Sequence, residues 1–135
     1  MREAVLDTNV IIYALAGQPA DLAAGARRLL AAAGDGRVQL WVTAAVIAEA
    51  VYVLSGPQFR STRKDVADRL TALVRLPGMV GDDIAAIGYG LRRFADGVDF
   101  VDGHLAGRAL ERGMAVATFN VRHFAPDVPV FDLSK

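Results

Sequence analysis

Short apolar runs alternate with amphipathic segments along this chain of 135 residues, and this alternation most constrains its fold. The runs at 4–6, 38–42, 79–80, 114–118 and 130–131 are typical of buried strands. Strands separated by helical crossovers form parallel sheets that are covered on both faces. The pattern therefore predicts a three-layer α/β/α domain with a short central parallel sheet. No linker or repeat interrupts it, so we expect residues 1–135 to form a single domain.

Helical periodicity fills the intervals between these strands. The predicted helices cover 10–15, 21–33, 44–54, 61–75, a segment that begins at residue 82 or 83, and 99–112. Thr43 is a suitable N-cap for the apolar helix that ends at Leu54. Gly113 is a suitable residue to end the helix predicted over 99–112.

Composition excludes several classes of function. The chain has 15 basic and 15 acidic residues, so a polybasic clamp that holds nucleic acid by net charge is excluded, although local basic patches remain open. It has no cysteine, which excludes disulfides and thiolate metal sites and fits a reducing compartment. No segment is typical of a membrane span or a signal peptide, so we expect a soluble, cytoplasmic protein.

Two acidic residues stand out in the first half of the chain. Asp7 directly follows the first predicted strand, at the sheet edge where α/β proteins collect their ligands, but it can equally cap the next helix. Glu49 is the only charged residue between positions 44 and 54, so we expect it to be buried. A buried carboxylate needs a partner, and a salt bridge with an arginine, a metal ligand and a catalytic base all remain open.

Asp99 and Asp102 lie one turn apart at the start of a predicted helix. They can form a capping box, yet Asp102 also heads the apolar stripe that should face the sheet. We therefore expect Asp102 to converge with Asp7 and Glu49, and Asp99 to cap the helix or support the site. Carboxylates held close together need a cation between them, and oxygen ligands suit Mg²⁺ or Mn²⁺. Such a cluster supports hydrolysis of phosphodiester bonds.

Four stretches together resemble the PIN domain family: residues 4–15 (AVLDTNVIIYAL), Glu49 in its apolar helix, 98–113 (VDFVDGHLAGRALERG) and 114–124 (MAVATFNVRHF). Within that family the chain is most similar to the toxin subunits of VapBC toxin–antitoxin modules. The resemblance implies an endoribonuclease dependent on Mg²⁺ or Mn²⁺, an RNA substrate, an antitoxin partner and a homodimer. It also implies a set of site residues: the metal ligands Asp7, Glu49 and Asp102, the adjacent Asp99, and the supporting residues Thr8, Asn9 and Thr118.

Asn120 stands where many members of the family carry another Asp. Asn keeps one carbonyl oxygen but lacks the charge, which leaves open whether the site holds one metal ion or two. The alternative function is therefore a PIN-like module that binds RNA or protein without cleaving.

Other residues have mainly structural interpretations. Two basic clusters, at Arg60, Arg63 and Lys64 and at Arg92 and Arg93, are typical of solvated faces, with RNA positioning as the alternative. His104 and His123 lack a paired ligand spacing and are predicted to lie at the surface or at helix caps. Three aromatic residues, Trp41, Phe119 and Phe124, are predicted to pack in the core or at sheet edges. The apolar surplus predicts an exposed patch for a partner.

Overall fold

The protein is represented by a computed structural model, which describes residues 2–124 and 126–133. The elements follow one another as β1 (Arg2–Val5), α1 (Thr8–Ala16), α2 (Ala20–Gly34), β2 (Val38–Trp41), α3 (Ala44–Leu54), α4 (Arg63–Val74), β3 (Met79–Val80), α5 (Ile84–Ala95), α6 (Phe100–Arg112), β4 (Val116–Thr118), α7 (Val121–Phe124) and β5 (Val130–Asp132). The predicted α/β class and its alternation of strands and helices are confirmed. Helix α7 was not predicted, because four residues are too few to show a helical period.

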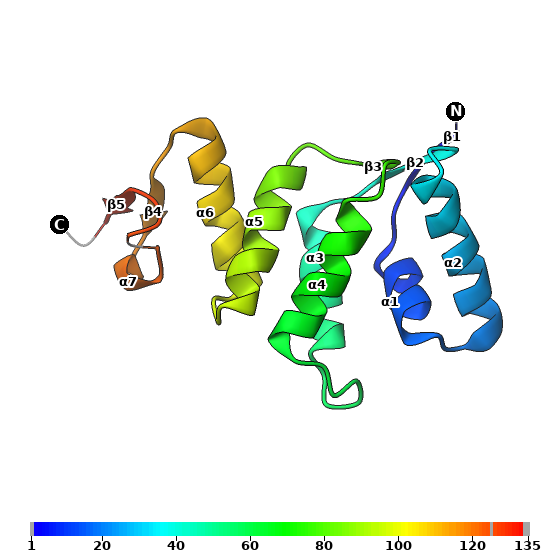
Figure 1. The fold of residues 1–135 in the computed structure, drawn as a ribbon. Helices are drawn as coiled ribbons and strands as arrows, with labels where there is room; N and C mark the ends of the chain where they lie inside the picture. The colour runs from blue at the N-terminus through cyan, green and yellow to red at the C-terminus, as the bar shows by residue number, and fades with distance from the viewer. Residues whose placement is uncertain (1, 125, 134–135) are drawn as a thin grey trace.

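The elements form successive layers across the molecule (Figure 1). The α1–α2 pair lies at one end, and strands β1, β2 and β3 run between it and the α3–α4 pair. The α5–α6 hairpin follows, and β4, β5 and α7 lie at the far end, beyond α6. The two ends of the chain therefore lie on opposite sides of the molecule.

The strands form two separate parallel sheets in the part of the chain that the structure describes, rather than one central sheet. The first has the order β1-β2-β3, with Val5 opposite Trp41 in its register. The second contains β4 and β5 alone, with Val116 opposite Val130. The sequence predicts the strands and their parallel sense but not this separation, because periodicity does not say which strands are neighbours.

Two apolar clusters correspond to the two sheets. The larger lies around the first sheet and the helices α1 to α5 and also includes Phe100 of α6. Its largest fully buried members include Leu6, Ile11, Leu40, Ile47, Leu54, Leu70, Ile87 and Leu91. The smaller joins α6 to the second sheet and consists of Ala106, Ala109, Val116, Phe124 and Val128. The β4–β5 unit is thus anchored to α6.

Helix boundaries follow local capping chemistry. The Thr43 side chain accepts a hydrogen bond from the backbone N–H of Val46, which confirms it as the N-cap of α3. Helix α4 begins later than predicted because Thr62 and Asp65 form a reciprocal capping box. Gly113 ends α6 with φ of 62°, in the left-handed region that glycine adopts without strain.

Helices α5 and α6 pack unusually closely, through glycines. A Cβ atom added at Gly103 would lie 3.1 Å from the Cα of Gly90, and one at Gly107 would lie 3.0 Å from the Cα of Ala86. Such an approach is possible only where both helices present minimal side chains. It fixes the position of α6, and with it the positions of Asp99 and Asp102.

None of the helices between residues 2 and 133, leaving aside residue 125, is both long and apolar enough to cross a membrane.

Candidate acidic site

The first group of polar residues lies where β1 ends. The hydroxyl of Thr8 donates a hydrogen bond of 3.1 Å to Glu49 Oε2, which joins the start of α1 to the middle of α3. Thr8 is only 3% exposed, whereas its neighbours Asp7 and Asn9 are exposed. Asp7 occupies the N-cap position of α1, yet its side chain makes no capping hydrogen bond. The Asp7 carboxylate is therefore not used as a helix cap.

The structure corrects the expectation that Glu49 is buried. Helix α3 turns Ile47, Ala50, Val51 and Leu54 into the core and leaves Glu49 exposed. The apolar composition of α3 suggests a helix that is buried on every side. Small alanines, however, also occupy its solvent side, where Tyr52 is 83% exposed. The salt-bridge alternative is wrong as well, since no ion pair involves Glu49 among the described residues.

The second group of acids lies at the start of α6. Asp99 is the N-cap residue, but its side chain makes no capping hydrogen bond, so the capping-box alternative is wrong. Asp102 Oδ2 lies 3.2 Å from His123 Nδ1 on α7. Both carboxylates line a pocket of about 420 Å³, together with Arg93, Gly97, Val98, Arg122 and His123. This pocket combines acidic and basic groups.

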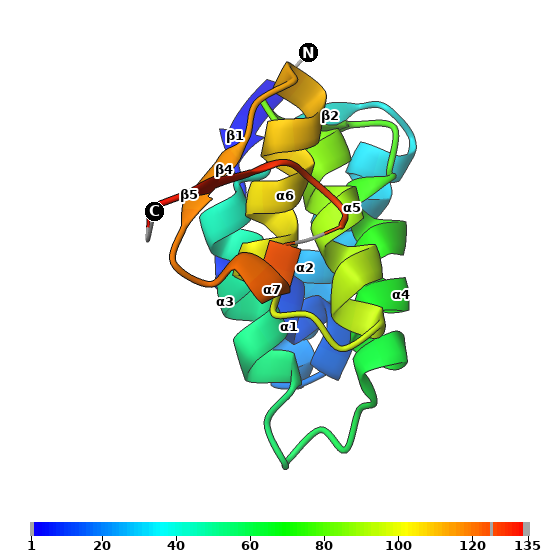
Figure 2. The same ribbon diagram turned by 90° about the vertical axis from the view of Figure 1, so that its left-hand side faces the viewer.

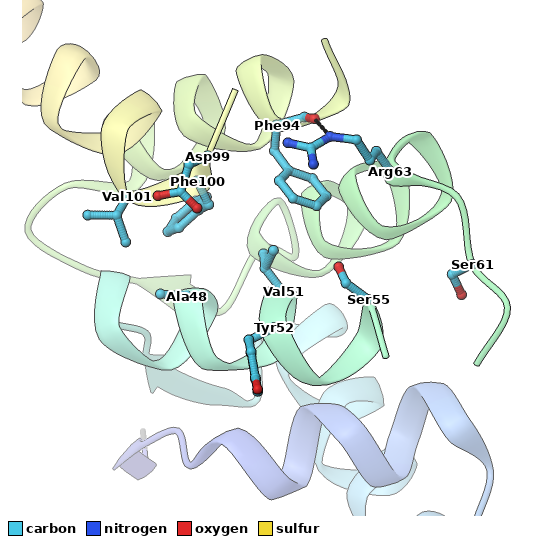
Figure 3. Close-up of a pocket in the computed structure, with 10 residues that line it drawn as sticks. All are labelled: Ala48, Val51, Tyr52, Ser55, Ser61, Arg63, Phe94, Asp99, Phe100 and Val101. Carbon is cyan, nitrogen blue, oxygen red and sulfur yellow. Dashed lines mark hydrogen bonds between the residues drawn. The ribbon is translucent and has the colours of Figure 1, made fainter. Parts of the chain in front are cut away.

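A second pocket, of about 370 Å³, separates the start of α6 from α3 (Figure 3). Asp99 and Val101 line it from α6, and Ala48, Val51 and Tyr52 line it from α3. Asp99 thus lines both pockets, and this one lies along the helix that carries Glu49.

The last predicted site residues follow β4. The backbone N–H of Asn120 donates a hydrogen bond of 2.9 Å to Thr118 Oγ1, and Asn120 itself is exposed. Phe119 is 73% exposed rather than packed, Trp41 is 39% exposed, and Phe124 is buried as predicted. Thr118 ends β4 of the second sheet and Asn120 follows it by two residues, whereas Asp7 follows β1 of the first sheet.

The expected convergence of Asp7, Glu49 and Asp102 is not found among the described residues. Across residues 2–124 and 126–133, no three His, Asp or Glu side chains lie close enough to hold a metal ion. The donor chemistry, carboxylate and amide oxygens, suits Mg²⁺ or Mn²⁺. The arrangement in the described part of the chain does not fit such an ion, because it does not bring three of these acids together, although Asp99 lines one pocket with α3, the helix that carries Glu49.

Most of the predicted RNA-positioning residues make contacts within the protein. Arg63 donates to the carbonyl oxygens of Phe94 (2.6 Å) and Val98 (2.8 Å), so it holds α4 to the end of α5. Arg93 pairs with Asp96 and Asp127, and the Arg92 guanidinium lies 5.8 Å from the centre of the Tyr89 ring.

Lys64 lies 2.6 Å from Asp68, whose hydrogen bond and charge raise the pKa of the lysine above its ordinary value. Arg60 is exposed, in a left-handed backbone conformation with φ of 50°.

The sequence did not identify two histidine contacts. His104 Nε2 lies 2.6 Å from Asp83 Oδ2, and its ring stacks on Phe100, so this histidine is largely buried rather than at the surface. His123 contacts Asp102 from α7. No periodicity or motif signals either pair, because each joins residues 21 positions apart in different elements.

Comparison with known proteins identifies the family of this chain. No curated protein matches the chain. The family model described as PIN domain matches residues 4–127, from β1 to the segment after α7, and this span contains every acidic residue described above. PIN domains are generally nucleases, so the match supports a hydrolase of the nuclease kind. Since the match covers nearly the whole chain, this protein belongs to the PIN domain family.

Proposed function

We propose that this protein is an endoribonuclease that requires Mg²⁺ or Mn²⁺ and acts as the toxin of a type II toxin–antitoxin module. The family match supports nuclease chemistry. The observation that carries the proposal is the hydrogen bond from Thr8 to Glu49, since it holds a carboxylate of α3 beside the end of β1, where Asp7 lies. Carboxylates at strand ends are the groups that a hydrolase of this kind requires.

The proposed site contains Asp7, Glu49, Asp99, Asp102 and Asn120, with Thr8, Asn9 and Thr118 in supporting roles. Two observations support the use of these carboxylates for chemistry. Neither Asp7 nor Asp99 caps its helix with its side chain, and Glu49 forms no ion pair in the described part of the chain.

The proposed partners are RNA, an antitoxin and a second copy of the chain, all in the cytoplasm. The support is a set of exposed apolar side chains, among them Tyr52 (83% exposed), Phe119 (73%) and Phe131 (64%). An antitoxin could inhibit the enzyme by placing a basic side chain, most simply Arg, among the carboxylates.

A second candidate is a module that binds RNA or protein without cleaving. One observation favours it: in the described residues of a single chain, no group of three acids is close enough to hold a metal ion. The two candidates differ in whether the purified protein cleaves RNA at all.

The experiment is an RNA cleavage assay on protein stripped with EDTA, with and without added Mg²⁺ or Mn²⁺. We expect cleavage to be lost in EDTA and restored by either ion. Full activity of metal-free protein would refute the metal requirement, and RNA binding without cleavage under all conditions would favour the module. Co-purification from the native operon, with cleavage measured before and after partner removal, tests the antitoxin.

A further inference from the structure

The segment that follows β4 exposes an aromatic ring. Phe119 is 73% exposed, whereas Phe124 is buried in the smaller apolar cluster and anchors α7. Two hydrogen bonds hold the turn between them: the Asn120 N–H donates to Thr118 Oγ1 (2.9 Å), and the His123 N–H donates to the Asn120 carbonyl oxygen (3.0 Å). The fold therefore fixes the backbone around Phe119 and leaves its ring in solvent.

A single exposed apolar side chain is common in proteins, so the surroundings of Phe119 carry the argument. This ring lines a pocket of about 360 Å³ together with Asn120, Val121, Arg122 and His123. Two members of this set, Arg122 and His123, also line the pocket of about 420 Å³ at the start of α6. The two pockets are therefore neighbours, and each has the size of a small-ligand site, about 300–1,000 Å³.

The shared residues bring the exposed ring close to two carboxylates of the proposed site. Helix α7 follows β4 and lies at the lower end of α6 in Figure 2, where α6 begins. The contact between His123 Nδ1 and Asp102 Oδ2 (3.2 Å) joins the two helices. A ligand that fills both pockets therefore extends from the Phe119 ring to the carboxylates of Asp99 and Asp102.

The two arginines of the larger pocket differ in what they already contact. The Arg93 guanidinium pairs with Asp96 and Asp127. Arg122 is exposed and enters no ion pair with any residue that the structure describes. A guanidinium suits a phosphate group, because it can donate two parallel hydrogen bonds to its oxygens. An anion therefore fits on the α7 side of this pocket, and the acids lie on the α6 side.

We propose that residues 119–123 bind one nucleotide of a single-stranded RNA, with its base stacked on the Phe119 ring and its phosphate bound by Arg122. That the ligand is RNA rests on the proposed function. Aromatic rings beside basic groups are the usual means of binding single-stranded nucleic acids. A duplex does not fit, because its neighbouring base pairs cover the faces of the bases.

The nucleotide site gives the segment after β4 a role in substrate binding. A nucleotide held by Phe119 and Arg122 places the adjoining phosphodiester bond beside Asp99 and Asp102. Because every base has an aromatic face, stacking on Phe119 contributes affinity with little preference among the four bases.

RNA binding measured in EDTA tests the site separately from cleavage. The probe is a short fluorescein-labelled single-stranded RNA of mixed sequence, and fluorescence anisotropy gives its dissociation constant. Phe119→Ala should weaken binding roughly 5- to 150-fold through loss of one stacked base. Phe119→Trp keeps an aromatic face and should bind like the wild type. Leu22→Ala is the control, since Leu22 is an exposed apolar residue of α2, at the other end of the molecule from α7 (Figure 1).

The salt dependence of binding identifies the phosphate contact. Loss of one phosphate contact in Arg122→Gln should reduce the slope of log affinity against log salt concentration by about 0.7 for a single strand. Phe119→Ala should leave this slope unchanged, because stacking releases no counterion. Arg28→Gln removes an exposed arginine from α2 and is the matched control, for which we also expect an unchanged slope.

Melting scans first establish that the variants fold. The stacking is overturned if Phe119→Ala binds the single strand like the wild type, or if the wild type binds the duplex formed with the complementary strand equally well. An unchanged slope in Arg122→Gln overturns the phosphate contact. Failure of the wild type to bind the single strand overturns the whole site. Loss of self-association in Phe119→Ala, with RNA binding intact, would instead assign the ring to a protein interface.

These measurements separate the nucleotide site from the proposed function. If the wild type binds RNA with these dependences but cleaves none with either metal ion, the nucleotide site stands and the proposed endoribonuclease fails. If the wild type cleaves RNA but neither Phe119→Ala nor Arg122→Gln changes binding, the proposed function stands and the nucleotide site fails.

Discussion

Thr8 and Glu49 are 41 positions apart in the sequence, yet the Thr8 hydroxyl donates a hydrogen bond of 3.1 Å to Glu49 Oε2. Thr8 is the first residue of α1 and is buried, whereas Glu49 extends from the exposed side of α3. The bond therefore fixes an exposed carboxylate to a rigid position at the end of β1. Without it, the Glu49 side chain would be free to rotate in solvent.

Replacing Thr8 by Val keeps the shape of the side chain and removes the donor. We expect a loss of about 0.5–1.5 kcal/mol in the free energy of unfolding, since water can still reach the exposed Glu49 carboxylate. Thr71→Val on α4 is the matched control, because Thr71 makes no side-chain hydrogen bond within the part of the chain described. Urea denaturation of both variants measures the difference. Equal stabilities would show that the Thr8–Glu49 bond does not persist in solution.

Glu49→Gln should leave stability within about 0.5 kcal/mol of the wild type, as an exposed substitution does. Gln retains an oxygen that can accept from Thr8, and no ion pair among the described residues is broken. Under the proposed function, RNA cleavage should nevertheless be lost, because the charge is removed.

Glu111→Gln, near the end of α6, is the control for this substitution, since Glu111 contacts only Arg108 among the ion pairs of the described residues. It should retain cleavage. A melting scan and a cleavage assay on both variants suffice. A loss of roughly 3–5 kcal/mol in Glu49→Gln would restore the buried ion pair that the sequence suggested.

The sequence predicts the secondary structure of this protein better than it predicts the burial of individual side chains or the pairing of the strands. Thr43 and Gly113 mark helix ends through local chemistry, and both predictions are confirmed. The prediction that Glu49 is buried is wrong because alanines are frequent in α3. Alanine is apolar enough to suggest burial and small enough to tolerate exposure. The placement of β4 and β5 in a sheet apart from β1 depends on contacts between distant elements, and no local pattern around Val116 or Val5 contains that information.

Arg63 provides a test of whether the basic cluster before α4 serves RNA or the fold. Its guanidinium donates to two carbonyl oxygens, of Phe94 and Val98, and lies 3.9 Å from the centre of the Phe94 ring. Arg63→Gln should lower the free energy of unfolding by about 1–3 kcal/mol through loss of these contacts. Arg60→Gln, at an exposed position, should change it by less than about 0.5 kcal/mol. Thermal denaturation of both variants distinguishes a structural arginine from a solvated one.

RNA binding by folded Arg63→Gln should equal that of the wild type if the role is structural. Weaker binding at a temperature where the variant is fully folded would instead assign Arg63 to phosphate positioning.

The glycines between α5 and α6 allow the last prediction. A Cβ atom at Gly103 would lie 3.1 Å from the Cα of Gly90 and 3.3 Å from its carbonyl oxygen, and backbone atoms cannot move aside without separating the helices. Overpacking of this kind costs about 1–3 kcal/mol, against a gain of about 1 kcal/mol when Ala replaces Gly within a helix. Gly103→Ala should therefore be destabilising by about 1 kcal/mol.

Gly88→Ala on α5 should instead raise the free energy of unfolding. The nearest atom to a Cβ at Gly88 is the end of the flexible Arg92 side chain, at 3.6 Å, so only the gain in helix propensity remains, about 1 kcal/mol. Chemical denaturation of the two variants compares the same substitution at a crowded and an open position. Stabilisation by Gly103→Ala as large as that by Gly88→Ala would mean that α6 does not pack this closely on α5.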